Sequence, residues 1–295
     1  MSDDEQALRR RLERLAALAE RALIDWLGAE PSPEIFDEHR AFRWEAERGA
    51  GRLVPIERPA AFDLADLIGV DTAVERFDRN IRQFLAGLPF NDVLLFGERG
   101  TGKSSSVRGV LARYGDRGLR VVEVDRRDLV HLPRILRALR AGDEHHFIVF
   151  CDDLSFGPGE SGYRELKAAL EGSLEAPASN VCIVATSNRR HLVPESMAEN
   201  REARVDAEGE LHLGEALEEK LALVDRFGLR LGFYNFDQTT YLEIVSHYLA
   251  QAGFDELDEA TRRDALRWAL ERGSRSGRTA RQFVDDVVGR RGLGA

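Results

Sequence analysis

A glycine-rich segment that ends in Lys-Ser, residues 97–104, contains the residue types with the clearest chemistry in this chain. It reads Gly-Glu-Arg-Gly-Thr-Gly-Lys-Ser, which fits the pattern G-x-x-x-x-G-K-[ST]. Such glycines let backbone N–H groups converge on a phosphate, while the lysine reaches β- and γ-phosphates and the last hydroxyl binds Mg²⁺. The predicted phosphate-binding residues are Gly97, Glu98, Arg99, Gly100, Thr101, Gly102, Lys103, Ser104 and Ser105.

Two carboxylates follow an apolar run further along the chain. Residues 146–153 read His-Phe-Ile-Val-Phe-Cys-Asp-Asp, the pattern of a buried strand that ends in acids. Beside a phosphate-binding loop, Asp152 would hold Mg²⁺ directly or through water. Asp153 would orient or deprotonate the attacking water. The alternative is a strand followed by a plain Asp-Asp turn.

A third polar end comes after the next apolar run. Residues 181–188 read Val-Cys-Ile-Val-Ala-Thr-Ser-Asn. Ligands of open parallel sheets bind outside the carboxyl ends of the strands, where Asn188 is expected to lie. Its amide would donate to a γ-phosphate or position the water.

These residues need a scaffold of alternating strands and helices. The predicted strands are 92–96, 119–124, 146–151, 180–185 and 229–234. Helical patterns separate them, which predicts an α/β fold, a P-loop NTPase with a five-stranded parallel sheet flanked by helices. After Phe236 only helical patterns remain, at 238–252, 258–272 and 279–290. We therefore expect a small, all-helical C-terminal lid.

The N-terminal part is predicted to be helical. A heptad-like apolar stripe runs through a helix at 3–28, which packs on its own domain or on a partner. A second helix is expected from Ser32-Pro33 to about Arg48, followed by a Gly- and Pro-rich linker. The predicted domains are 1–60, 61–236 and 237–295. Residues 198–214 are polar, with a short hairpin around Glu208-Gly209.

Composition limits the class of protein. Of the residues, 43% are hydrophobic and 32% charged, and no apolar run approaches the roughly 18 residues that span a bilayer. An acidic N-terminus without an apolar core and only two cysteines, Cys151 and Cys182, predict a cytoplasmic protein with reduced thiols. The net charge of −10 argues against strong non-specific nucleic-acid binding by the isolated protein.

The order of these motifs resembles that of the AAA+ ATPases, over about residues 62–290. The resemblance is strongest to a bacterial AAA+ family called domain of unknown function 815. It identifies Asn188 with the polar residue called sensor 1. The segment Asp225-Arg226-Phe227-Gly228-Leu229 is similar to the Arg-Phe element of clamp loaders and replication initiators. This similarity implies that Arg226 is an arginine finger. A salt bridge of Arg226 with Asp225 or Glu219 is the alternative.

The same resemblance assigns the two ends of the nucleotide site. Leu67-Ile68-Gly69-Val70-Asp71 is similar to the segment that packs on adenine, which implies contacts from Ile68 and Gly69. Ser276-Gly277-Arg278-Thr279-Ala280-Arg281 is similar to the start of the sensor 2 helix. It implies a phosphate contact from Arg278, or from Arg281 in its place. The alternative is a solvated, arginine-rich helix.

Two features depart from the family pattern. The family usually has Asp-Glu after the acidic strand, whereas this chain has Asp152-Asp153. A base that is one methylene shorter implies slow hydrolysis or a bridging water. Residues 126–132 also lack the aromatic–aliphatic–glycine loop of unfoldases, which argues against polypeptide threading.

The sequence thus predicts a homo-oligomeric ATPase that uses ATP and Mg²⁺ to remodel or load a protein or protein–nucleic-acid partner. An ATP-dependent binding switch with negligible hydrolysis is the alternative, because of Asp153. A loader on DNA-bound machinery is a third hypothesis, based on the Arg-Phe element and the basic C-terminal helix. No Asn-Lys-x-Asp guanine motif and no LSGGQ-like signature is present, so GTPases and ABC ATPases fit the sequence less well.

Overall fold

The computed structural model describes most of the chain. The described residues are 33–47, 50–140, 142–155, 162–171, 178–188, 222–254 and 257–293, with the single residues or pairs 11, 14, 204–205 and 211–212. The helix predicted at 3–28 lies outside these residues, except for Arg11 and Arg14, which are helical. Within 198–214 only β7 (Arg204–Val205) and β8 (Leu211–His212) are described, and they pair antiparallel around the predicted hairpin turn.

The centre of the fold is a 7-stranded sheet with the order β2-β1-β4-β5-β6-β3-β9. The five strands predicted from the sequence are β3 (Val93–Gly97), β4 (Leu119–Glu123), β5 (His146–Cys151), β6 (Val181–Ser187) and β9 (Leu229–Phe233). All neighbouring pairs among them are parallel. Their carboxyl ends therefore lie at one edge of the sheet, as the site requires.

Two further strands correct the prediction for residues 32–60. Instead of a helix to Arg48, the structure has a short α2 (Glu34–Glu38), then β1 (Ala41–Glu47) and β2 (Ala50–Pro55). β1 pairs parallel with β4, and β2 pairs antiparallel with β1. The predicted five-stranded sheet therefore has two additional strands at the β4 edge, and it begins before residue 61. The domain boundaries themselves stay a prediction.

Side-chain alternation explains why β1 is a strand. Phe42 and Trp44 are buried in the core, while Arg43 between them points outward and donates two hydrogen bonds to Glu123 of β4, at 3.0 and 2.8 Å. A period of two is the strand period, and this tertiary pairing overrides the helix propensity of the segment. A Cβ added at Gly51 would lie 2.2 Å from the Trp44 ring, so the predicted glycine linker instead provides packing space inside the hairpin.

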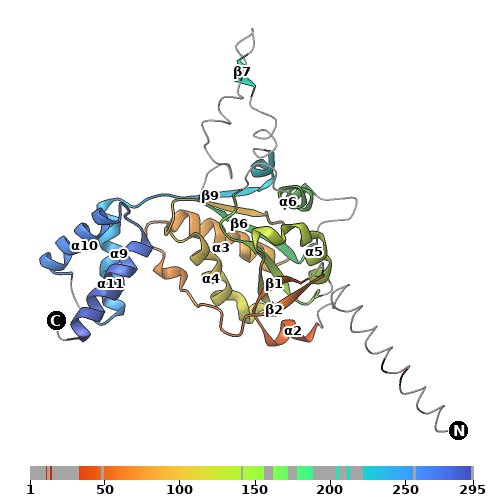
Figure 1. Ribbon diagram of the computed structural model, residues 1–295, viewed down its shortest axis with the longest axis horizontal. Coiled ribbons are helices and arrows are strands. Elements are labelled where there is room, and N and C mark those ends of the chain that lie inside the picture. The colour runs from red at the N-terminus through yellow and green to blue at the C-terminus, as the bar shows by residue number, and fades with distance from the viewer. Residues whose placement is uncertain are drawn as a thin grey trace.

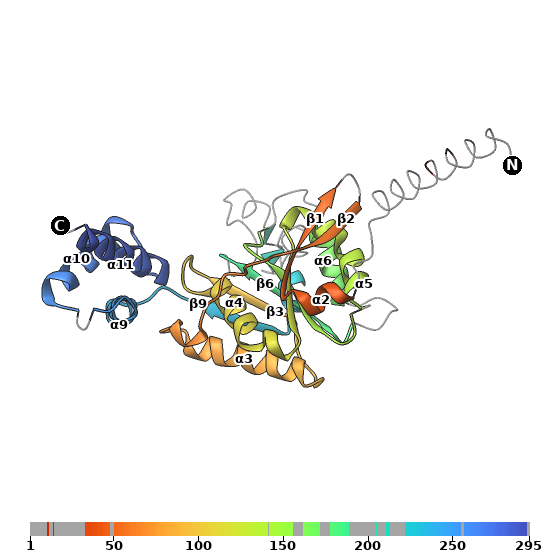
Figure 2. The same ribbon diagram turned by 90° about the horizontal axis from the view of Figure 1, so that it is seen from below.

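Helices cover both faces of the sheet (Figure 2). α3 (Asp71–Leu85) and α4 (Lys103–Tyr114) pack on one face, and α5 (Leu132–Arg140) and α6 (Gly162–Glu171) pack on the other. Within β3 the buried side chains alternate between the two cores: Val93 and Leu95 face the first pair of helices, and Leu94 faces the second. Cys151 and Cys182 are free and buried in the two cores.

The chain ends in three helices beside the sheet domain, which we call the lid (Figure 1). They are α9 (Gln238–Gln251), α10 (Glu259–Glu271) and α11 (Gly277–Gly292), within one or two residues of the predicted bounds. Each begins at a side-chain cap: Asp237, Asp258 and Ser276 accept the backbone N–H three residues further on. In the described part of the chain, no helix is long and apolar enough to cross a membrane.

Short 3₁₀ turns connect the larger elements. They are η1 (Leu64–Asp66), η2 (Gly115–Arg117) and η3 (Arg126–His131). The turn η1 precedes the segment predicted to contact adenine, and the lid and this segment share one continuous hydrophobic core. The lid therefore packs against this segment, beside the sheet domain (Figure 2).

One carboxyl group destabilises this scaffold at neutral pH. Asp92, just before β3, accepts a 2.7 Å hydrogen bond from the backbone N–H of Ile183, and burial raises its pKa to about 6. Because the folded state holds this proton more tightly than the unfolded chain does, stability falls as pH rises from about 4 to 6. We expect Asp92→Asn, which keeps an acceptor for Ile183, to raise the free energy of unfolding by about 3 kcal/mol at pH 7.

Urea titrations at several pH values test this expectation. The gain of the variant over the wild type should shrink towards pH 4, where the wild-type carboxyl is protonated in the folded protein. A gain that is the same at pH 4 and pH 7 would show that ionisation of Asp92 is not its cause.

Candidate functional site

Between β3 and α4 the glycines make the tight turn that the sequence pattern predicts. Gly97, Gly100 and Gly102 have φ values of 128°, 75° and 110°, a region that other residues rarely adopt. A Cβ at Gly97 would lie 1.9 Å from the Phe233 carbonyl oxygen, and one at Gly102 would lie 2.5 Å from the Leu67 side chain. Close backbone packing therefore leaves room only for glycine at Gly97, whereas at Gly102 the positive φ is the stronger reason for glycine.

Lys103, the first residue of α4, lies folded back over this loop. Its Nζ donates to the carbonyl oxygens of Gly97 at 2.8 Å and Glu98 at 2.7 Å, and to Asn188 Oδ1 at 3.1 Å. Burial lowers the pKa of Lys103 to about 8, although the carboxylates of Asp152 and Asp153 partly oppose this shift. An anion bound beside the ammonium would favour its charged form.

The residues predicted to hold Mg²⁺ meet in the structure. Ser104 Oγ donates to Asp152 Oδ1 at 2.7 Å, and Thr186 Oγ1 donates to the same oxygen at 2.5 Å. A carboxylate and a hydroxyl fit Mg²⁺, which prefers oxygen ligands and usually completes its shell with phosphate oxygens and water. Among the described residues no group of three or more His, Cys, Asp or Glu could hold a metal alone, so phosphate oxygens would have to contribute.

Asn188 connects the lysine to the second acid. Its Nδ2 donates to Asp153 Oδ1, while its Oδ1 accepts from Lys103. Asp153 has φ 51°, and no other non-glycine residue that the structure describes has a positive φ. Its N–H donates to Thr186 Oγ1 at 2.9 Å, which fixes this turn after β5. Strained backbone of this kind is typical of functional sites.

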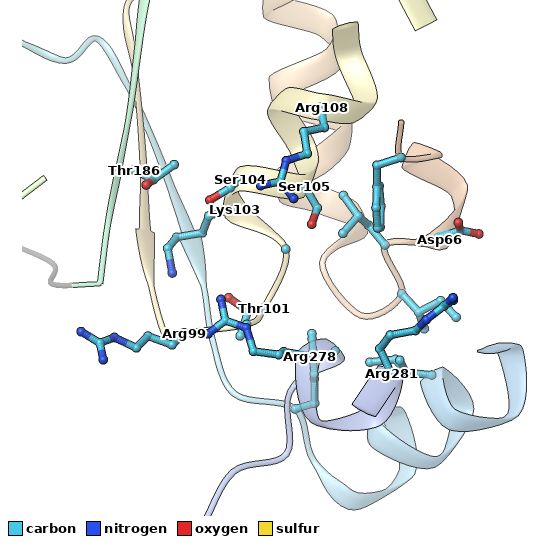
Figure 3. Close-up of a pocket in the computed structure, with 18 of the residues that line it drawn as sticks. Asp66, Arg99, Thr101, Lys103, Ser104, Ser105, Arg108, Thr186, Arg278 and Arg281 are labelled. Carbon is cyan, nitrogen blue, oxygen red and sulfur yellow. The ribbon is translucent and has the colours of Figure 1, made fainter. Parts of the chain in front are cut away.

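The lid approaches the phosphate-binding loop from the side opposite to α4 (Figure 3). The backbone N–H of Arg278 donates to the Gly100 carbonyl oxygen at 3.2 Å, and its side chain extends along the loop. Arg281, one turn on, pairs with Asp285 at 3.2 Å and lies 5.3 Å above the Tyr248 ring. Of the two arginines, Arg278 is the one placed beside the phosphate-binding loop.

These groups line one cavity of about 600 Å³. One end is polar and holds the loop, both aspartates and Asn188. The other end is largely apolar, with the charged Asp66 and Arg281 beside Tyr248. Its apolar lining residues are Phe62, Leu67, Ile68, Phe236, Ile244 and Tyr248. Charged groups at one end and apolar side chains at the other match a molecule with phosphates and a planar base.

Most residues predicted for the site line this cavity. The exceptions are Gly69, Gly97, Glu98 and Arg226. Gly69 supports the apolar end from behind, because a Cβ there would lie 2.4 Å from Thr240 and 3.2 Å from Phe236. Sequence reasoning did not single out Thr186, Arg108 or Tyr248, which also line the cavity.

Arg226 does not line the cavity of its own chain. It is in a helical stretch, 222–226, that ends before the amino end of β9, while the phosphate-binding loop follows the carboxyl end of β3. Its guanidinium donates to the Ala222 carbonyl oxygen, and Asp225 pairs instead with Arg230 at 2.8 Å. Glu219, the other acid considered as a partner of Arg226, lies outside the described residues. Arg226 is at the wrong end of the sheet to serve its own site.

Comparison with known proteins places the chain in a family. The model of the family described as "protein of unknown function (DUF815)" matches residues 37–291. A search of the curated proteins found no match.

The chain is also similar to solved structures of a Holliday junction branch migration motor, RuvB, from Thermotoga maritima. The TM-score is 0.51 at 15% identity, with 76% of this chain and 63% of that chain covered. Two variants of the same protein, each with a single substitution, give TM-scores of 0.52 at 15% identity and the same coverage. At this identity the likeness shows a shared fold, and the chain spans 63% of the length of these structures.

Proposed function

The chain belongs to the DUF815 family and has the fold of the AAA+ P-loop ATPases, and from this premise we propose that it binds and hydrolyses Mg·ATP as an oligomer. We propose further that hydrolysis is coupled to the remodelling or loading of a macromolecular partner. The observation that carries the proposal is one hydrogen-bonded network in one cavity. It joins Lys103, Asn188 and Asp153, and beside them Ser104, Asp152 and Thr186.

Each group in the network has a role in this chemistry. Lys103 would exchange its carbonyl partners for oxygens of the β- and γ-phosphates. Ser104 and Asp152 would hold Mg²⁺, which neutralises charge on these phosphates when it is bound. Asp153 would accept a proton from water as the water oxygen bonds to the γ-phosphorus and the bond to ADP breaks. Asn188 would keep Asp153 in position for this step.

The proposal of an oligomer rests on the position of Arg226. A side chain that lies at the amino end of β9 is remote from its own phosphate-binding loop at the other end of the sheet. Developing charge on a γ-phosphate is often stabilised by an arginine from a second molecule. We propose that Arg226 serves the site of a neighbouring subunit in this way.

One observation favours the alternative, an ATP-dependent binding switch with negligible hydrolysis. The Asp153 carboxylate is already engaged by the Asn188 amide, and it is shorter than the glutamate usual in the family. In a switch, ATP would still bind and join the core to the lid through Arg278. Binding is therefore common to both functions, and hydrolysis separates them.

Lys103 provides the test of nucleotide binding. We expect Lys103→Ala to weaken ATP binding about a hundredfold, because charge-assisted hydrogen bonds to the phosphates are lost. The wild-type protein should also take up a fraction of a proton on binding ATP near pH 8, since the free lysine has a pKa of about 8 and the bound phosphates favour its charged form. Its ATP affinity should fall as pH rises from 7.5 to 9.5.

Calorimetry in two buffers with different ionisation enthalpies measures both the affinity and the proton uptake. Circular dichroism checks that Lys103→Ala is folded. A folded variant that binds ATP as tightly as the wild type would refute the assignment of this loop.

A further inference from the structure

Arg108 lines the cavity but takes no part in the network described above. It lies on α4, one helical turn beyond Ser104, so the two side chains share one face of the helix. The side chain is exposed, and its guanidinium lies back along the helix beside Ser104 and Ser105 (Figure 3). This direction is usual for a long helical side chain, which points towards the helix N-terminus.

Several other cationic side chains near this cavity have partners, although no side-chain partner is found for Arg99 or Arg278 among the described residues. Lys103 donates to the loop and to Asn188, and Arg281 pairs with Asp285. Further along the same helix, Arg113 pairs with Asp78 at 3.0 Å. For Arg108, no hydrogen bond or ion pair is found with any residue that the structure describes.

The acidic side chains of the cavity are already engaged. Asp152 accepts from Ser104 and Thr186, and Asp153 accepts from Asn188. Asp66 accepts from His247 and Gln251, both at 2.7 Å. Arg108 therefore adds a positive charge to a helix N-terminus that is already positive, which is unfavourable unless the cavity holds an anion.

The two ends of the cavity fix where that anion would lie. Lys103 marks the β- and γ-phosphates, and the apolar residues around Tyr248 mark the base. The α-phosphate and the ribose must lie between these ends, along the first turns of α4. Arg108 is five residues beyond Lys103, about 7.5 Å along the helix axis, which places it beside this middle part.

We propose that Arg108 binds a non-bridging oxygen of the α-phosphate and so sets the affinity for both ATP and ADP. This proposal rests on the proposed function, since it assumes a nucleotide in the cavity. In this arrangement the Arg108 guanidinium neutralises charge on the α-phosphate, whereas Lys103 and Mg²⁺ act on the two outer phosphates.

Affinities of Arg108→Ala for ADP and ATP give the first test. The variant should lose about tenfold to a hundredfold in affinity, by the same factor for both nucleotides, because both carry the α-phosphate. Arg108→Lys should recover part of the loss. Arg79→Ala, which removes an exposed charge on α3 outside the cavity, is the matched control and should bind as the wild type does.

Adenosine 5′-O-(1-thiodiphosphate) gives the sharper test, because sulfur replaces one or the other non-bridging α-oxygen in its two diastereomers. Without Mg²⁺, the wild type should bind one diastereomer at least about threefold more weakly, and Arg108→Ala should bind both equally. Equal binding by the wild type, a difference that persists in Arg108→Ala, or a loss for ATP but not for ADP would each overturn the proposal. A wild type that binds neither nucleotide would refute the proposed function as well, whereas tight binding that Arg108→Ala leaves unchanged would refute this inference alone.

Discussion

Arg226→Ala is expected to lower the ATPase rate by about 10³–10⁵-fold while ATP affinity changes little. The reason is geometric. Arg226 is at the opposite end of the sheet from its own loop, so in the proposed mechanism it would act on the γ-phosphate of a neighbour. In that position it would stabilise charge that develops in the transition state, and such interactions change the rate more than the affinity.

Mixed oligomers make this experiment decisive. Lys103→Ala subunits should not turn over but keep Arg226, whereas Arg226→Ala subunits keep an unchanged ATP site. Mixing the two inactive variants should restore part of the activity, and wild-type turnover per subunit should rise with protein concentration. Arg230→Ala, which removes a nearby exposed arginine that pairs with Asp225, is the control and should keep its activity. Absence of complementation together with equal turnover in dilute and concentrated samples would rule out the trans mechanism.

Asp153→Asn is expected to leave ATP bound but to slow its hydrolysis by about 10²–10⁴-fold, the usual contribution of a general base. The substitution is mild for the fold. Asparagine tolerates the left-handed backbone that Asp153 adopts, and its amide oxygen can still accept from Asn188. The variant therefore removes the proton acceptor and little else.

Single-turnover hydrolysis at saturating Mg·ATP measures this loss. Asp152→Asn is the comparison, because it should instead weaken Mg²⁺-dependent nucleotide binding. Asp153→Glu restores the residue usual in the family and should keep activity. A longer side chain is, however, less favourable than aspartate at a backbone φ of 51°. Hydrolysis by Asp153→Asn at the wild-type rate would exclude Asp153 as the base. A wild type without turnover in any oligomeric state would favour the binding switch.

The sequence predicted the parts of the fold whose signals are local. The five central strands are short apolar runs, and the lid helices have their own caps at Asp237, Asp258 and Ser276. The phosphate-binding loop and the acids after β5 are contiguous motifs. For this reason these motifs could be assigned from the sequence alone. The sheet then places them at one edge.

The parts that the sequence did not predict depend on distant pairing. β1 is a strand because it pairs with β4, about 80 residues later in the chain. No feature of residues 41–47 alone identifies β4 as the partner. Thr186 looks like one more residue of a buried strand until Asp152 is placed beside it. The position of Arg226 relative to the loop likewise follows only from the pairing of β9 with β3.

Two backbone hydrogen bonds hold the phosphate-binding loop, one to the end of β9 and one to the lid. The N–H of Glu98 donates to the Phe233 carbonyl at 2.9 Å, and the Gly100 carbonyl accepts from the N–H of Arg278. Helices α9 and α10 lie in the chain between Phe233 and Arg278, and Arg278 is in the first turn of α11. In the loop the two contacts are only two residues apart, at Glu98 and Gly100. A rotation of the lid relative to the sheet must twist the backbone around Gly100 or break one of these hydrogen bonds. A change in the shape of the loop is therefore transmitted to the lid through the backbone, even when no arginine side chain takes part.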